Sequence, residues 1–145
     1  MGDVDRISVE VIVNTGIEEA WNEFTNPESI KKWNFASDDW ICPKAVNDIK
    51  NGGEFNYRME SRDGKYGFDS GGRFERINKL KNIEYIIGDG RRVIVTFENI
   101  DGKTKITEVF EKESQNSAEL QRSGWQAILN NYKKYIEGKS QKDSI

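Results

Sequence analysis

The sequence predicts an α+β protein in which a curved antiparallel sheet of about six to seven strands wraps around one long C-terminal helix. Three observations predict it: an alternating apolar first segment, a strand-and-turn region from about 44 to 113, and a last segment with one apolar stripe at helical spacing. A sheet with one apolar face must cover that face, and only the last segment is long enough to do so. The 145 residues suit one domain, expected over 1–138 and followed by a polar tail at 139–145.

The N-terminal region predicts a strand followed by two short helices. Apolar residues occupy every second position of 7–13, which is typical of a strand with one buried face. Thr15, with Glu18 three residues later, resembles a capping box for the first helix. Asn26-Pro27 predicts the start of the second helix, which we expect to end near Trp33, since Asn is a favoured N-cap and Pro is favoured at the first position.

The middle region predicts a meander of strands. The runs lie near 54–60, 67–77, 82–88, 91–99 and 104–112. Asp63-Gly64, Asp89-Gly90 and Asp101-Gly102 stand at three of the four connections between these runs, and Asp-Gly is a strong hairpin signal. The strands should therefore be antiparallel.

The last segment predicts a helix from about 117 to 137. Asn116 with Glu119 resembles a capping box, and Gly138 stands where a glycine commonly ends a helix. The apolar stripe consists of Trp125, Ile128, Leu129, Tyr132 and Ile136.

Small residues on the inner face of one strand predict a cavity. The inward residues of the run at 67–77 are Phe68, Ser70, Gly72 and Phe74. Because protein interiors leave few voids, two small side chains among bulky ones favour an unfilled volume under the helix. The alternatives are that Trp125 or Tyr132 fills the space, or that Gly72 marks a bulge.

Glu108 is an acid on an otherwise apolar face, because its strand turns Ile106 and Phe110 inward. Such a carboxyl either pairs with a cation, keeps its proton through a raised pKa, or lines a wet pocket. An arginine such as Arg58, Arg73 or Arg92 would make it a structural ion pair; otherwise Glu108 is a candidate general acid or base.

The predicted ligand site combines this acid with the inward aromatic and small residues. It also includes Trp33 and Trp40, which flank the loop after the second short helix; the alternative for these two side chains is ordinary core packing. Its members are Trp33, Trp40, Tyr57, Met59, Phe68, Ser70, Gly72, Phe74, Tyr85, Phe97, Glu108, Phe110, Trp125, Leu129 and Tyr132. Asp38 and Asp39 lack further ligands at a regular spacing, so we expect no metal and no cofactor.

Composition excludes several classes of function. A net charge of −3 without a basic stripe argues against nucleic-acid binding. The absence of histidine removes Ser-His-Asp and Cys-His triads and histidine-ligated zinc. The lone Cys42, with no signal-like or membrane-spanning segment, predicts a cytoplasmic protein that binds neither membrane nor nucleic acid.

Several motifs together resemble a known family. Asp48-Ile49-Lys50-Asn51-Gly52-Gly53-Glu54-Phe55 is similar to the D-x-(R/K)-x-G-G-x-(F/W) segment of the heat-shock-protein-90 ATPase activator homologues, within the START-like SRPBCC superfamily. The segments at 18–33, 72–77 and 124–129 agree with it, and the resemblance runs over about 7–137. It implies a helix-grip fold with a deep cavity between sheet and last helix. Relatives bind lipids, polyketides or hormones, and some act as cyclases, without a shared catalytic set.

These observations rank three functions. The first is binding of a small, mostly hydrophobic molecule. The second is a cyclase- or hydrolase-type enzyme with Glu108 as acid or base and Tyr57 or Tyr85 as proton donor. The third is a co-chaperone-like interaction module, which ranks last because the family's namesake carries an additional N-terminal domain. Exposed hairpin edges also make a homodimer plausible.

Overall fold

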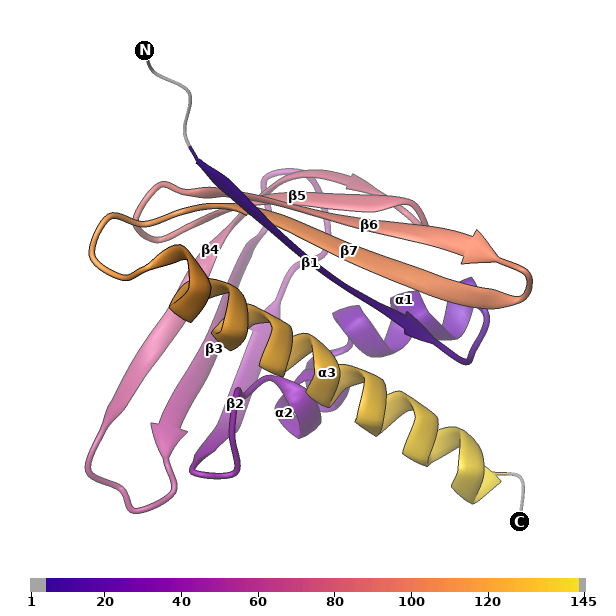
Figure 1. Ribbon diagram of the computed structural model, residues 1–145, viewed down its shortest axis with the longest axis horizontal. Helices are drawn as coiled ribbons and strands as arrows, with labels where there is room; N and C mark the ends of the chain where they lie inside the picture. Colours follow the sequence, from indigo (N-terminus) through magenta and orange to yellow (C-terminus); the bar gives the residue numbers. More distant parts are fainter. Residues whose placement is uncertain (1–4, 144–145) are drawn as a thin grey trace.

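The order of elements along the chain is the predicted one: a strand, two short helices, six strands and a long helix (Figure 1). The computed structural model describes residues 5–143, with side chains to 138. The strands are β1 (Arg6–Val13), β2 (Trp40–Asn47), β3 (Glu54–Ser61), β4 (Gly67–Asn78), β5 (Asn82–Ile87), β6 (Arg92–Ile100) and β7 (Lys103–Glu111). The helices are α1 (Ile17–Thr25), α2 (Pro27–Trp33) and α3 (Ala118–Asp143).

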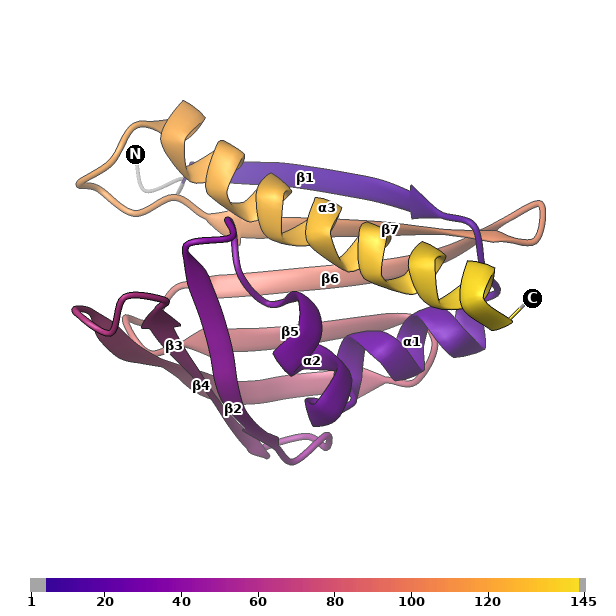
Figure 2. The ribbon, with the colours of Figure 1, turned by 90° about the horizontal axis from the view of Figure 1, so that it is seen from below.

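Within the described residues the seven strands form one antiparallel sheet in the order β1-β7-β6-β5-β4-β3-β2. Strands β1 and β2 lie at opposite edges of this sheet, and α1 and α2 connect them along the chain. The sheet curls, so that one part, made of β2, β3 and β4, diverges around α3 from the other part, made of β5, β6, β7 and β1. The described helices lie on the concave side of the sheet (Figures 1 and 2). The predicted α+β helix-grip fold is confirmed.

The core lies between the concave face and the helices. Strand alternation places every predicted inward residue of β1, β6 and β7 at 8% exposure or less. On α3, the fully buried Tyr132 packs its ring against Phe24 and Trp33 and donates a hydrogen bond of 2.6 Å to the carbonyl oxygen of Ala20. This contact ties α3 to α1.

Strand β2 was not predicted as a separate element, and Trp40, expected in a loop, begins it. Pro43 in its middle has no N–H to donate to a ladder, which argues against a central strand. The strand lies at the sheet edge, and its pairing with β3 shifts register between Ile41 and Lys44, around the proline. An edge position with an irregularity is where a sheet tolerates proline.

Two of the three predicted helix starts have different caps. Thr15 does not cap α1; its hydroxyl donates to Glu19 Oε2 at 2.6 Å, and Gly16 is the N-cap without a side-chain hydrogen bond. The N-cap of α3 is Ser117, not Asn116, because Ser117 Oγ accepts from the Leu120 N–H at 3.1 Å. For α2 the prediction is confirmed, since Asn26 Oδ1 accepts from the Glu28 N–H at 3.0 Å.

The predicted helix end at Gly138 is wrong, because α3 continues to Asp143. Gly138 does not adopt the left-handed conformation of a C-cap glycine, unlike the hairpin glycines Gly64, Gly90 and Gly102. A glycine inside a helix costs only about 1 kcal/mol relative to alanine, so the helix passes through it. The predicted polar tail is thus helical at 139–143, and 144–145 lie outside the described residues.

Candidate functional site

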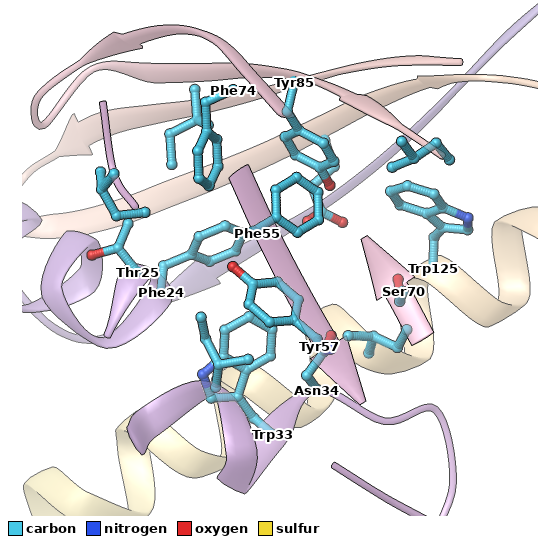
Figure 3. Close-up of a pocket in the computed structure, with 16 residues that line it drawn as sticks. Phe24, Thr25, Trp33, Asn34, Phe55, Tyr57, Ser70, Phe74, Tyr85 and Trp125 are labelled. Atoms are coloured by element: carbon cyan, nitrogen blue, oxygen red, sulfur yellow. The ribbon is translucent and has the colours of Figure 1, made fainter. Parts of the chain in front are cut away.

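A cavity of about 130 Å³ lies between the sheet and the helices (Figure 3). Its sixteen lining residues are mostly apolar, and seven are aromatic. They are Phe24, Thr25, Ile30, Trp33, Asn34, Ile49, Phe55, Tyr57, Ser70, Phe74, Ile83, Tyr85, Ile87, Glu108, Trp125 and Ile128. The wall thus draws on α1, α2, α3 and four strands, and it contains neither lysine nor arginine.

About half of the predicted site residues line this cavity. They are Trp33, Tyr57, Ser70, Phe74, Tyr85, Glu108 and Trp125. Strand alternation turns the members on β3, β4, β5 and β7 inward, and the stripe on α3 turns Trp125 toward them.

Five other predicted residues are buried but lie outside the cavity wall. They are Met59, Phe97, Phe110, Leu129 and Tyr132. Phe110 supports the wall from behind, since its ring stacks on Trp125 with centroids 3.9 Å apart. Phe97 packs instead against Trp21 and Phe24. Facing the concave side is therefore not the same as facing the cavity, because rings already fill most of that side.

Phe68 and Trp40 lie away from the cavity. Phe68 is 51% exposed, and its ring lies 5.8 Å from that of Trp40, centroid to centroid. Trp40 lines an open surface depression that also includes Tyr66. Phe68 follows the first residue of β4, near a hairpin that extends away from α3, so its predicted inward orientation does not bury it (Figure 1).

The predicted void opposite Gly72 is absent. A Cβ added at Gly72 would lie 2.2 Å from the carbonyl oxygen of Ile86 and 2.8 Å from a ring carbon of Phe55. Neither Trp125 nor Tyr132 fills this space; the ring of Phe55, on the neighbouring strand β3, does. The cavity has its small side chain at Ser70 instead.

Glu108 sits in the wall of the cavity without a partner. Its exposed fraction is 8%, and its direct neighbours across the ladders are Val9 on β1 and Val95 on β6. Among the described residues none donates a hydrogen bond to its carboxyl or forms an ion pair with it. Burial raises the pKa of Glu108 from its ordinary value of 4.5 to about 8, so the carboxyl is mostly neutral at pH 7.

The arginines considered as partners of Glu108 are engaged elsewhere or lack contact with it. Arg58 pairs with Glu60 at 3.0 Å and with Asp69 at 3.7 Å. Arg73 pairs with Glu75 at 3.0 Å. Arg92 is exposed on β6. Glu108 therefore forms no structural ion pair with any of these three arginines.

Two tyrosines add hydroxyl groups to the cavity, and both hydroxyls point into the space between the rings in Figure 3. Tyr57 Oη accepts a hydrogen bond of 3.1 Å from Asn47 Nδ2, and burial raises the pKa of Tyr57 to about 12. Burial also raises the pKa of Tyr85, and the nearby Glu108 carboxyl adds to the shift. Both phenols therefore keep their protons at neutral pH.

The model of the family described as Activator of Hsp90 ATPase homolog 1-like protein matches residues 14–137. This chain belongs to that family. The AHSA1-like family lies within the START-like SRPBCC superfamily, so the resemblance noted from the motifs is confirmed. Folds of this superfamily typically bind small hydrophobic ligands.

Solved structures agree with the family assignment. The solution structure of the AHSA1-like protein from Aeromonas hydrophila is 35% identical, with a TM-score of 0.89 and 94% of each chain covered. A protein from Cytophaga hutchinsonii is 44% identical, with a TM-score of 0.80 and again 94% of each chain covered. A Staphylococcus aureus protein of unknown function shares the fold at 18% identity, with a TM-score of 0.71, covering 96% of this chain and 98% of its own. No curated protein matches the chain.

Sequence reasoning missed nine wall residues of this AHSA1-like chain. They are Phe24, Thr25, Ile30, Asn34, Ile49, Phe55, Ile83, Ile87 and Ile128. Strand alternation does turn Phe55, Ile83 and Ile87 inward, so that signal could have found them. The residues from α1 and α2 carry no such signal, because only the packing of these helices beside α3 brings them to the cavity.

Within the described residues, no helix is both long and apolar enough to cross a membrane. No three acidic or cysteine side chains of that part of the chain lie together as metal ligands. Cys42 is buried, and burial raises its pKa.

Proposed function

We propose that this AHSA1-like chain binds a small, mostly hydrophobic molecule carrying one polar group in the cavity between the sheet and α3. The observation that carries the proposal is an unpartnered acid, Glu108, in the wall of a cavity otherwise lined mainly by rings and aliphatic side chains. An acid inside an apolar wall lowers stability unless something offsets it, and a ligand with a polar group would do so.

The cavity volume limits the size of this molecule. Typical ligand pockets measure about 300–1,000 Å³, and an apolar cavity of about 150 Å³ holds benzene. The 130 Å³ found here therefore suits a molecule of about one ring. A lipid- or polyketide-like ligand, as expected from the resemblance, would require the wall to open.

Native mass spectrometry of mildly purified protein tests the proposal, together with titration of acetophenone followed by tryptophan fluorescence. Trp33 and Trp125 line the cavity and should report binding. We expect Ser70→Leu to abolish the fluorescence change by filling the cavity, and Ser70→Ala to retain it. A protein that retains no small molecule and accepts neither acetophenone nor ethylbenzene would refute the proposal.

Acid–base catalysis is the second candidate, and the pKa of Glu108 near 8 is the observation that favours it. A neutral Glu108 could donate its proton to a leaving oxygen in a hydrolase- or cyclase-type reaction. Hydrolysis of phenyl acetate by wild type and Glu108→Gln tests this. We expect the variant to lose turnover with an unchanged circular dichroism spectrum; equal rates would remove Glu108 from the mechanism.

The co-chaperone-like module remains the third candidate. Its support is a group of aromatic side chains near the end of the β3–β4 hairpin, where Tyr66 is 68% and Phe68 51% exposed beside Trp40.

A further inference from the structure

Several O–H groups in the cavity wall have no hydrogen-bond acceptor among the described residues. Tyr57 accepts from Asn47, which leaves the proton of its own hydroxyl free of any described acceptor. The Tyr85 hydroxyl has no hydrogen-bond partner among the described residues, and neither has the carboxyl of Glu108. The hydroxyl of Thr25 is already used, since it donates to the carbonyl oxygen of Trp21 at 2.9 Å.

The side chains around Glu108 determine whether its carboxyl is neutral or charged. Val9 and Val95 flank it on β1 and β6, and Trp125 contributes a ring from α3. The titratable groups that face it across the cavity are the phenols of Tyr57 and Tyr85, from β3 and β5. Because the wall contains no lysine or arginine, no cation there stabilises a carboxylate, and burial favours the neutral acid.

We propose that the polar group of the ligand is a neutral oxygen acceptor, a ketone, aldehyde or amide carbonyl, which accepts hydrogen bonds from the Glu108 carboxyl and the Tyr85 hydroxyl. This inference rests on the proposed binding function and names the ligand's chemical class. A neutral carboxylic acid in an apolar site is a strong hydrogen-bond donor, and a phenol beside it supplies a second bond.

Charged ligands fit the same wall less well. A carboxylate ligand would enter an apolar cavity without a cation to pair with, which is strongly unfavourable. An ammonium group would suit the aromatic rings, but Glu108 would provide its counter-charge in this wall only after the loss of the Glu108 proton. Because burial holds the pKa of Glu108 near 8, this loss is unfavourable at neutral pH.

Matched probes of one-ring size test the inference. Acetophenone carries the carbonyl, ethylbenzene lacks it, and phenyltrimethylammonium is a cation whose charge does not change with pH. At about pH 6 we expect acetophenone to bind about tenfold more tightly than ethylbenzene, the ratio that one good hydrogen bond gives. At about pH 9 this preference should shrink and phenyltrimethylammonium should bind more tightly, because Glu108 is ionised there.

The possible outcomes of these titrations distinguish the carbonyl inference from the binding function. Equal affinities for acetophenone and ethylbenzene at about pH 6, or a preference for the cation there, would overturn the carbonyl inference while leaving the binding function in place. Failure of all three probes to bind would overturn the binding function itself, and the inference with it.

Two variants identify the donors. Glu108→Gln keeps N–H donors but cannot titrate, so we expect it to retain the preference for acetophenone and to lose its pH dependence. The matched control is Glu98→Gln, an exposed position on β6, which should behave as the wild type does. A pH dependence unchanged in Glu108→Gln would overturn the role of Glu108.

Tyr85→Phe provides a test that does not depend on any Glu108 variant folding. We expect it to reduce the preference for acetophenone over ethylbenzene severalfold. In infrared spectra of wild-type protein, the carbonyl band of bound acetophenone should shift to lower frequency than in hydrocarbon solvent, and the shift should shrink in Tyr85→Phe. A band at the hydrocarbon position in the wild type would show that no donor contacts the carbonyl.

Discussion

At the scale of single residues, the alternation of β7 determines the unusual position of Glu108. The strand that turns Ile106 and Phe110 inward must also turn the residue between them inward, and its direct neighbours across the two ladders, Val9 and Val95, are apolar. The folded protein therefore keeps a proton on Glu108 that the unfolded chain releases above pH 4.5. Such a difference makes folding stability depend on pH.

We expect stability to fall with rising pH because of this group. Below pH 4.5 Glu108 is protonated in both the folded and the unfolded state, so the free energy of unfolding does not change with pH because of it. Between pH 4.5 and about pH 8 the free energy of unfolding declines, and above that the contribution of Glu108 is constant. The slope in that interval should be roughly 1 kcal/mol for each pH unit. In urea unfolding at a series of pH values, Glu108→Gln should remove this decline and Glu98→Gln should keep it. If Glu108→Gln showed a decline of equal size, groups other than Glu108 would be responsible for the pH dependence of stability.

Gly72 gives a second prediction at this scale. Because an added Cβ would meet the Ile86 carbonyl and the Phe55 ring, we expect Gly72→Ala to lower the free energy of unfolding by about 1–3 kcal/mol. Gly88→Ala is the control, since its Cβ would meet only the Gly71 carbonyl oxygen at an ordinary 3.7 Å. Equal stability of the two variants in urea unfolding would show that the Phe55 ring moves aside freely.

At the scale of elements, the strands other than β2 were predictable, whereas the N-cap of α1 and both ends of α3 were not. The predicted limits of β3 to β7 agree with the observed ones to within one residue, and at three of their four connections the glycines Gly64, Gly90 and Gly102 adopt the left-handed conformation that these turns need. Helix caps depend on which of several neighbouring polar side chains reaches a free N–H. Sequence spacing alone does not decide that for Asn116 and Ser117.

The cap of α3 can be tested directly. We expect Ser117→Ala to lower stability by about 1 kcal/mol and to speed hydrogen exchange at the amide of Leu120, which loses its acceptor. Asn116→Ala should leave exchange at that amide unchanged, because Asn116 contacts Glu113 instead. Faster exchange at the Leu120 amide in Asn116→Ala, but not in Ser117→Ala, would show that Asn116 is the N-cap, as the sequence predicted.

At the scale of the whole molecule, the cavity is defined by how the helices meet the curled sheet. Phe24 from α1, Trp33 from α2 and Trp125 from α3 close the side opposite the strands (Figure 3). Their rings, with Phe55 over Gly72, leave about 130 Å³ where a deep cavity was expected. The homodimer expected from exposed sheet edges stays a prediction, and the proline-containing irregularity in β2 blunts one of those edges.

This closure predicts a size limit for ligands. We expect affinity to fall from acetophenone to 2-acetonaphthone, because the second ring exceeds the cavity and forces α3 away from the sheet. Calorimetric titration of the two ketones measures the difference. Hydrogen exchange along α3 should rise only with the larger ligand; tighter binding of 2-acetonaphthone without such a rise would contradict the limit.

The sequence by itself determined the class of fold, the inward faces of the strands and the inward position of Glu108, because a period of two is a local property that every strand carries with it. The tertiary structure decided which inward residues border empty space. Phe68 and Gly72 satisfy the same alternation as Ser70, yet one is exposed near a protruding hairpin and the other lies under Phe55. Whether a small residue leaves a void depends on the rings that neighbouring elements place above it, and this packing is not encoded in the spacing of any single segment.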